Sequence, residues 1–233
     1  MTKSTRVLRA DGEATYKRIL ESAGELFATS GFAETSNKAI AAKARVDLAS
    51  INYHFGSRGG LYQAVLAEAH RRLISMESLQ EVSAANLSAR DKLKRVIEGV
   101  VEAAVGQQGW HSRVLVRELM SPTSHLQVLQ QSEVFPKFQV VLGILSEITS
   151  IRPDDPALFR CAISIMAPCA MLLVAGRNVP AIAEAVSRTP RETLVAHLYH
   201  FAIGGLKAIG QEHKKHALCN AAQQERHVCA QAK

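Results

Sequence analysis

The sequence has few of the features that mark secreted or membrane-spanning proteins. Its 4 cysteines form no CxxC pair, which argues against a disulfide framework and favours a reducing compartment. The most apolar stretch, 161–176, is interrupted by Ser164 and Pro168, so we expect no run of the roughly 20 residues that a transmembrane helix needs. The polar N-terminus shows no secretory signal. These absences predict a cytoplasmic protein without a membrane partner.

Glycine and proline are also scarce, at 14 and 7 residues, which excludes collagen-like and linker-rich chains. Because 47% of the residues are hydrophobic and 21% are charged, the chain has enough apolar residues for a sizeable core. It lacks the phosphate-binding motifs GxxxxGK(S/T) and GxGxxG, the zinc-protease motif HExxH and the hydrolase motif GxSxG. We therefore expect no cofactor and no enzymatic activity.

Positive charge is in excess and is concentrated near the N-terminus. The chain has 28 Lys and Arg against 21 Asp and Glu, a net charge of +7. Residues 1–75 hold 11 of the basic and 7 of the acidic residues, so this first third carries more than half of the excess. A local basic excess favours a polyanionic partner such as nucleic acid.

The hydrophobic pattern is helical along the chain, and we find no convincing strand. Over residues 14–30 apolar side chains recur at helical spacing, with Gly31 as a C-terminal stop. Two short helices, 37–44 and 48–55, follow, and a longer helix starts after Ser57. This is the layout of a helix-turn-helix. The sequence therefore predicts an all-α protein with an N-terminal three-helix DNA-binding domain.

Caps and prolines mark helices in the larger C-terminal part. Ser88 stands three residues before Asp91 and predicts a helix start, whereas Pro136 interrupts a long apolar stretch and predicts a break. Asp155-Pro156 and Thr189-Pro190 each place an N-cap residue before a proline at the first helical position. We therefore expect a helical bundle after the DNA-binding domain.

The stretch AIAAKARVDLASINYHFGSRGGLYQAVL, with Phe27, Gly31 and Phe32 before it, resembles the DNA-binding signature of TetR-type transcriptional regulators. The resemblance covers residues 14–73. Residues 117–119, 121–122 and 135–138 further resemble the ligand domain of the CecR-like branch. Several elements in register make such a match more specific than a lone motif.

Together the patterns and the resemblance divide the chain into four parts. We expect a flexible arm over 1–13, the DNA-binding domain over 14–75, a ligand-binding and dimerisation domain over 76–212, and a polar, disordered tail over 213–233. The tail residues His213, His216 and Cys219 have a spacing that metal ligands also show, but a solvated tail is the simpler interpretation, and we predict no metal site.

The sequence departs from the family pattern at four places around the helix-turn-helix. Arg45 stands where glycine is usual, so the turn needs either positive φ at a non-glycine residue or another geometry. Asp47 replaces the usual Ser or Thr cap, and Asn52 replaces a tyrosine that contacts phosphate. Gly59-Gly60 replaces an acidic pair, which removes negative charge from a helix N-terminus that should face phosphate. These changes affect the operator sequence rather than the DNA-binding role.

Candidate DNA contacts follow from the expected docking of the second short helix in the major groove. Ser50 and Asn52 are expected to read base edges, and Ala49 to pack on a thymine methyl group. Packing or solvation is the alternative for each residue, above all for His54. The residues expected to contact the phosphate backbone, directly or as helix caps, are Thr35, Ser36, Lys38, Tyr53, His54 and Arg58.

The resemblance implies a small-molecule effector in the C-terminal domain and a homodimer through helices near 155–176 and 190–210. Arg113 and Arg117, four residues apart, would suit an anionic ligand, although Arg117 also fits a structural ion pair. Large apolar side chains at helical spacing are more often core than ligand contacts. The candidate ligand residues are Trp110, Arg113, Arg117, Met120, Phe138, Met166 and Cys169.

The sequence thus predicts a ligand-responsive regulator, most simply a repressor, that binds a palindromic double-stranded DNA operator as a dimer. One alternative is a helical ligand-binding enzyme or carrier whose N-terminal helices serve only as scaffold. Another is a nonspecific nucleoid-type protein that binds DNA by charge alone. The effector, the operator and the sign of regulation do not follow from the sequence.

Overall fold

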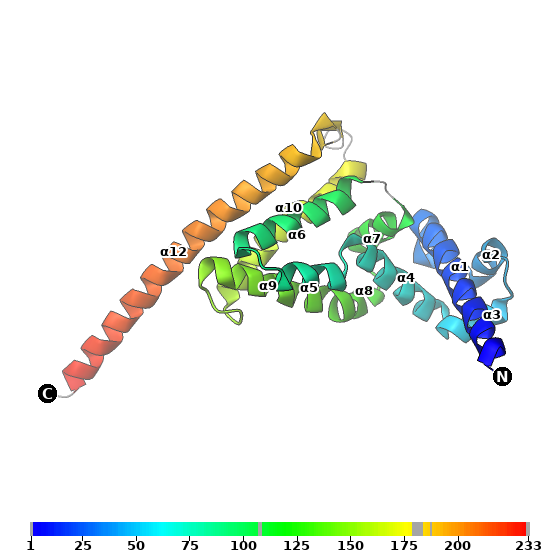
Figure 1. Ribbon diagram of the computed structural model, residues 1–233, viewed down its shortest axis with the longest axis horizontal. Helices are drawn as coiled ribbons and strands as arrows, with labels where there is room; N and C mark the ends of the chain where they lie inside the picture. The colour runs from blue at the N-terminus through cyan, green and yellow to red at the C-terminus, as the bar shows by residue number, and fades with distance from the viewer. Residues whose placement is uncertain (1, 107–108, 179–183, 187, 232–233) are drawn as a thin grey trace. The chain divides into compact units, whose positions relative to one another are not determined.

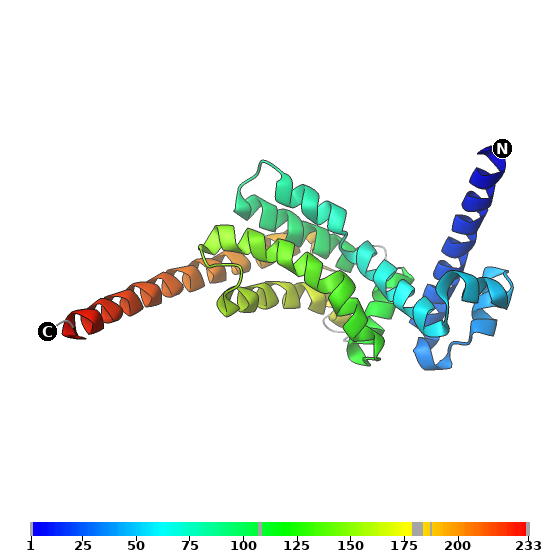
Figure 2. The same cartoon turned by 90° about the horizontal axis from the view of Figure 1, so that it is seen from below.

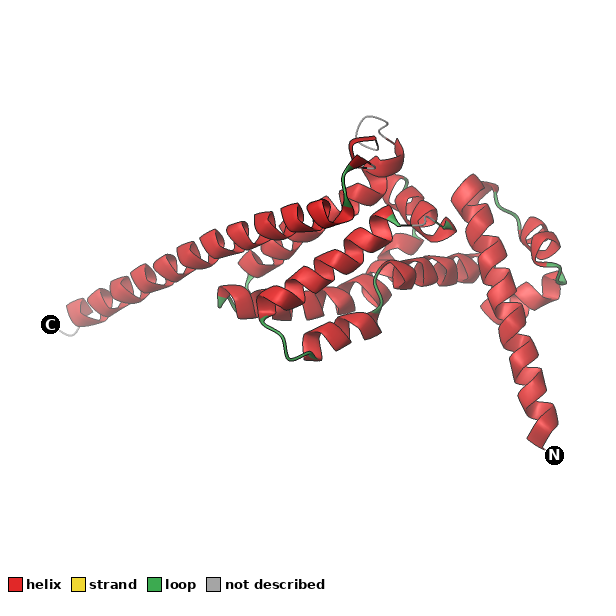
Figure 3. Ribbon diagram, turned by 45° about the horizontal axis from the view of Figure 1, so that its top comes forward, coloured by secondary structure: helices red, strands yellow, loops and turns green. Residues whose placement is uncertain are grey.

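The computed structural model of this chain describes residues 2–106, 109–178, 184–186 and 188–231. Within these ranges every regular element is a helix (Figure 3), which confirms the all-α prediction. The helices are α1 (Thr2–Glu34), α2 (Asn37–Ala44), α3 (Leu48–Phe55), α4 (Arg58–Leu73), α5 (Met76–Ala84), α6 (Ala89–Val105), α7 (Trp110–Met120), α8 (His125–Leu129), the π-helical turn η1 (Gln130–Val134), α9 (Phe135–Thr149), α10 (Pro156–Asn178) and α12 (Arg191–Gln231).

The chain folds into two compact units, whose helices are labelled in Figure 1. The first unit combines residues 1–76 with 103–136, and the second combines 77–102 with 137–233. This division differs from the single boundary near residue 75 that the sequence suggested. It differs because α7 and α8 pack on α1 and α4, so that part of the C-terminal region joins the N-terminal helices.

Local sequence explains the helix-turn-helix at the N-terminal end of the first unit. Gly31 adopts φ 83° and interrupts α1, as its position as a stop predicts. The Ser36 hydroxyl accepts a hydrogen bond from the Ala39 amide and caps α2. Arg45 adopts the left-handed conformation, with φ 54° and ψ 52°, so this residue accepts the strain that glycine avoids. Asp47 occupies the cap position of α3 without a side-chain capping hydrogen bond.

The core of the first unit is built from α1, α2, α3, α4 and α7. Ile19 and Phe27 of α1, Ile40 of α2 and Ile51 of α3 are fully buried. Trp110 of α7 packs so closely on Gly24 that a Cβ there would lie 2.3 Å from the indole ring. Because the interior is close-packed, the two short helices are held on a rigid base.

The second unit is a bundle that contains α6, α9, α10 and α12. Asp155 caps α10 by accepting a hydrogen bond from the Ala157 amide at 2.8 Å, as predicted. The break predicted at Pro136 is not found: α8, η1 and α9 follow one another without a gap, and the π-helical turn η1 lies just before the proline. Pro168 lies inside α10 without ending it. The Thr189 hydroxyl donates to the Ala185 carbonyl at 2.8 Å, and α12 begins two residues later at Arg191.

Helix α10 corrects the expectation about long apolar runs. Its segment Pro156–Val174, 19 residues with a mean hydropathy of 2.0, is long and apolar enough to cross a membrane. Ser164 and Pro168 do not lower the average enough to prevent this. Since 39% of the segment is buried inside the structure, and core helices pass the same test, this is weak evidence for a membrane.

Both chain ends differ from the flexible segments that we expected. Helix α1 begins at Thr2 rather than near residue 14 and extends past α2 and α3 (Figure 2). Helix α12 continues to Gln231. Residues 2–11 contain no glycine or proline, and residues 211–231 are rich in Ala, Gln, Glu and Lys, which have high helix propensity. Local propensity therefore extends the helices where amphipathic periodicity has ended.

Candidate nucleic-acid interface

One face of α3 is buried and the opposite face is exposed. Ile51 is fully buried beneath the helix. On the outer face, Ala49 and Asn52 are exposed and Tyr53 is 85% exposed, while Ser50 is partly buried. The structure thus brings the predicted base-contacting residues onto one surface. A short helix with such a face has the form that enters a DNA major groove.

Aromatic contacts fix α3 against α1. The Tyr16 ring stacks on Phe55, with centroids 4.7 Å apart. His54 lies edge-on to Tyr16 at 6.0 Å and to Tyr53 at 5.0 Å and is only partly exposed. These contacts account for His54 as a packing residue, which is the alternative that the sequence left open.

The predicted phosphate-contacting residues fall into two groups. Ser36, Lys38 and Tyr53 are exposed. Thr35 is buried and donates its hydroxyl hydrogen to the Gly31 carbonyl at 2.7 Å. Arg58 donates to the Thr35 carbonyl at 3.3 Å and lies 4.4 Å from the centre of the Phe32 ring. Thr35 and Arg58 therefore have structural contacts that explain them without DNA.

The start of α4 explains the glycine pair. The Ser57 hydroxyl accepts a hydrogen bond from the Gly60 amide at 3.0 Å and caps the helix. A Cβ on Gly60 would lie 2.2 Å from the Phe55 carbonyl oxygen, so α4 starts in direct contact with the end of α3. A side chain at residue 60 would push these two helices apart.

A polar network joins α1, α4 and α7 inside the first unit. The Trp110 indole donates to Glu21 at 2.6 Å, and Arg72 donates to both Glu21 and Glu68. Burial alone would raise the pKa of Glu21, but the hydrogen bonds from Arg72 and Trp110 lower it overall. These contacts place Trp110 in the packing of the first unit.

A second network joins α4 to the end of α7. The buried Glu118 carboxylate accepts the Tyr62 hydroxyl at 2.8 Å, the Thr123 amide at 2.9 Å and the Thr123 hydroxyl at 2.8 Å. Burial, together with the hydrogen bond to Glu118, raises the pKa of Tyr62 well above its usual range, so Tyr62 stays a donor. Nothing in the sequence marks this pair, since Tyr62 follows the apolar pattern of α4 and Glu118 looks like a surface residue.

The candidate ligand residues do not gather in one unit. In α7, Arg113 and Met120 are exposed, and Arg117 donates to the Thr29 carbonyl at 2.8 Å. In the second unit, Phe138 packs on Phe159 with ring centroids 5.3 Å apart.

The other two candidates of the second unit, Met166 and Cys169, lie on α10. Met166 is partly buried and Cys169 is buried. Burial raises the pKa of the Cys169 thiol to about 11.

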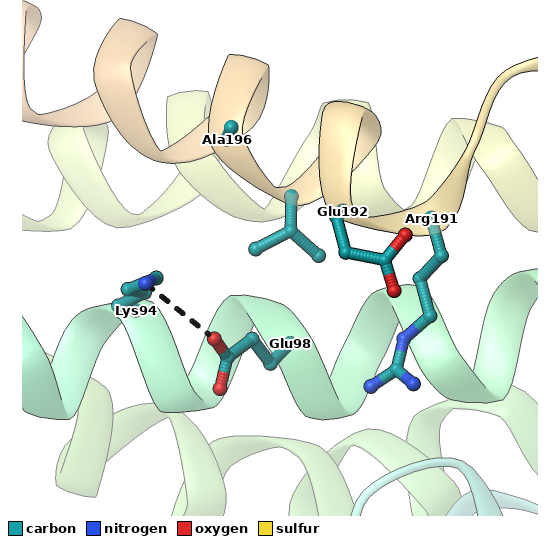
Figure 4. Close-up of a pocket in the computed structure, with 6 residues that line it drawn as sticks. Lys94, Glu98, Arg191, Glu192 and Ala196 are labelled. Carbon is teal, nitrogen blue, oxygen red and sulfur yellow. Dashed lines mark ion pairs between the residues drawn. The ribbon is translucent and has the colours of Figure 1, made fainter.

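A charged groove of about 380 Å³ lies between α6 and the start of α12 in the second unit (Figure 4). Lys94, Glu98, Arg191 and Glu192 line it over an apolar base. Lys94 lies 3.9 Å from Glu98, and Arg191 pairs with Glu102 at 2.6 Å. Because these opposite charges neutralise one another, the groove shows no preference for a ligand of either sign.

Helices α10 and α12 expose apolar side chains in the second unit. Phe201 is 72% exposed and Met171 is 56% exposed. A shallow apolar groove beside Phe201 is lined by Cys161, Ser164, Ile165, Phe201, Ala202, Gly205, Leu206 and Ile209. Exposed apolar side chains on adjoining helices are typical of protein–protein contact surfaces.

Among the described residues no group of His, Cys, Asp and Glu is arranged to hold a metal ion, and Cys219 of the predicted tail lies outside the described side chains.

Comparison with known families gives two matches along the chain. The family described as "Bacterial regulatory proteins, tetR family" matches residues 19–65. The "HTH-type transcriptional dual regulator CecR, C-terminal domain" matches residues 89–206, just over half of the chain. The first match covers the helix-turn-helix, and the second starts at α6.

Individual relatives agree with these matches. The chain is 32% identical over 89 residues to the "Probable HTH-type transcriptional regulator YttP" of Bacillus subtilis (strain 168), a match that covers 38% of this chain and only 42% of that protein. A TetR-like transcriptional regulator from Rhodococcus sp. RHA1 has the same fold, with a TM-score of 0.62 and 22% identity over 82% of this chain and 95% of that one. The transcriptional regulator FadR from Bacillus subtilis in complex with stearoyl-CoA gives a TM-score of 0.65 and 19% identity over 82% and 98%. The chain therefore belongs to the TetR family of bacterial regulatory proteins, as a helix-turn-helix transcriptional regulator with a CecR-type C-terminal domain.

Proposed function

We propose that this protein is a cytoplasmic, dimeric repressor that binds a palindromic operator and leaves it when a small molecule binds the C-terminal domain. The observation that carries the proposal is the exposed face of α3, where Ala49, Asn52 and Tyr53 project from a helix whose opposite side buries Ile51 completely. A rigidly held helix can present side chains to base edges with little loss of conformational entropy.

In this proposal Asn52 reads sequence, because its amide can donate to and accept from adenine in the major groove. Ser50 contacts a neighbouring base edge, and Ala49 packs on a thymine methyl group. Ser36, Lys38 and Tyr53 contact phosphates and orient the helix. Thr35, His54 and Arg58 support these contacts through the hydrogen bonds and ring contacts described above.

Binding-site selection from a random duplex library tests the proposal, because the selection itself identifies the operator. The wild-type chain should enrich a palindromic sequence, and Asn52→Ala should bind it about 5- to 150-fold more weakly, the loss of about 1–3 kcal/mol expected for a bidentate base contact. Its affinity for random duplex should change little. Asn86→Ala, an exposed asparagine of the second unit, is the matched control. Equal losses on selected and random duplexes would show that Asn52 does not read bases.

For the effector, we propose a partly apolar molecule that binds in the C-terminal domain. Phe138, Met166 and Cys169 are the candidate contacts in the second unit, and Arg113 and Met120 are candidates on the exposed face of α7. Support comes from FadR, whose fold is similar and which was solved with stearoyl-CoA. The contacts of Trp110 and Arg117 within the first unit favour packing roles for those two residues. An effector acts by preferring the conformation that does not bind DNA.

For the dimer, we propose that α10 and α12 pair with their copies in a second chain, over the residues 155–176 and 190–210. Phe201, Met171 and Ile163 are exposed apolar residues on these helices, and burying them would stabilise the pair. Two recognition helices held by such a dimer would contact half-sites one helical turn apart.

A further inference from the structure

The segment that links the effector domain to the DNA-contacting helices is α7 with α8. By sequence it lies within the CecR-type domain, which matches residues 89–206. By packing, residues 103–136 belong to the first unit, together with the helix-turn-helix. Because α7 and α8 belong to the CecR-type domain by sequence and contact α4 in the first unit, a shift of these helices would act directly on α4.

His125, the first residue of α8, is fixed in place by a chain of hydrogen bonds that starts on α4. Tyr62 donates to Glu118, and Glu118 accepts both polar hydrogens of Thr123. The Thr123 hydroxyl oxygen in turn accepts the His125 amide at 3.2 Å. The backbone of His125 is therefore positioned by buried groups of the first unit.

The His125 ring rests on the first turn of α4. Its Nδ1 lies 3.2 Å from Gln63 Nε2, and because an amide nitrogen only donates, Nδ1 is the acceptor. The ring lies edge-on to Phe32 at 5.1 Å and to Tyr62 at 5.5 Å. A Cβ on Gly59 would lie 3.1 Å from His125 Cε1, closer than ordinary van der Waals contact, so the ring occupies space that glycine leaves open.

The first turn of α4 also determines where α3 ends. Only Gly56 and Ser57 separate the two helices, and Gly60 lies directly against the Phe55 carbonyl oxygen. With no side chain between them, these two turns cannot slide past each other without a backbone clash. A displacement of the first turn of α4 would therefore move the last turn of α3 with it.

We propose that His125 is a positioning residue for DNA binding, and that the contact of its ring with Gly59 sets the orientation of α3. Gly59, which departs from the family pattern, leaves the space that the ring occupies. This inference rests on the proposed DNA-binding function and names the contact through which the α7–α8 segment regulates it.

A double-mutant cycle on the full-length chain tests the proposal, with the duplex selected by the wild-type protein as probe. Gly59→Ala should weaken specific binding about tenfold, the equivalent of about 1.4 kcal/mol, because the methyl group displaces the ring. His125→Ala also weakens binding. When His125→Ala is present, however, Gly59→Ala should cost less than about twofold, since the space is vacant. His125→Phe retains a ring on Gly59 and should restore most of the affinity.

Two comparisons separate positioning from general stability. Alanine is favoured over glycine in a helix by about 1 kcal/mol, so Gly59→Ala should leave the unfolding midpoint unchanged or higher while affinity falls. Gly60→Ala is the matched control, because a Cβ on Gly60 would meet the Phe55 backbone and not His125. The Gly60→Ala substitution should therefore cost the same affinity with and without His125→Ala. Equal tenfold losses for Gly59→Ala in both backgrounds, or a parallel fall in stability, would overturn the proposal. A wild-type chain that selects no sequence would instead contradict the proposed function.

Discussion

Removing the Tyr62 hydroxyl should destabilise the first unit by a measurable amount. The hydroxyl donates to the Glu118 carboxylate at 2.8 Å, and both side chains are only 1% exposed. A hydrogen bond to a charged partner contributes about 1.5–3 kcal/mol to the free energy of unfolding. A buried acceptor that loses its donor also cannot form a replacement hydrogen bond with water. For Tyr62→Phe we therefore expect a loss of about 2 kcal/mol, close to a 30-fold change in the folding equilibrium.

The assay is urea unfolding followed by tryptophan fluorescence, because the single tryptophan of the chain, Trp110, lies in the same unit. In a chain of this size the same loss should lower the thermal midpoint by about 4–8 °C. Tyr53→Phe is the matched control, since its ring is 85% exposed and surface changes stay within about 0.5 kcal/mol. A Tyr62→Phe variant as stable as the Tyr53→Phe variant would show that the hydrogen bond from Tyr62 to Glu118 does not stabilise the first unit.

Three further predictions concern the dimer, the pH dependence and the thiols. Phe201→Asp should convert the dimer to monomer in light scattering at micromolar concentration, whereas Val128→Asp, another exposed apolar position, should leave it intact. Because the pKa of Glu21 is lowered in the folded state, its stabilising effect is present above its unfolded pKa of about 4.3 and is lost as pH falls through the lower folded value. The stability advantage of wild type over Glu21→Gln in urea unfolding should therefore shrink below about pH 4; an advantage that persists there contradicts the assignment. Burial raises the pKa of Cys169 to about 11, so mass spectrometry should find it unmodified by iodoacetamide at about pH 8 until urea unfolds the chain, and rapid labelling of the native protein would refute this.

The helix-turn-helix could be predicted closely from the sequence because its signals are local. Residues 37–44 and 48–55 are the observed limits of α2 and α3, and Arg45 has positive φ, one of the two alternatives that its place in the turn left open. Caps, glycines and periodic apolar residues act within a few positions of one another, so a single sequence contains them.

The contacts of α7 could not be predicted in the same way. The Trp110 ring packs on Gly24 and its indole N–H donates to Glu21, although both residues are more than 80 positions away in the sequence. Glu118 likewise pairs with Tyr62 on another helix. Helical periodicity shows which side chains point inward but not which helix they meet. For this reason Trp110 and Arg117 were predicted from the sequence to contact the effector. In the structure both side chains contact α1 instead.

In the proposed complex, two copies of the chain place the outer face of α3 against two halves of one DNA site. Hydroxyl-radical footprinting on the selected duplex tests this arrangement. We predict two protected patches related by a dyad, with centres about 34 Å apart along the helix axis, and both should weaken in Asn52→Ala. A single patch, or uniform protection that does not depend on sequence, would show that the two copies do not bind two half-sites in this way.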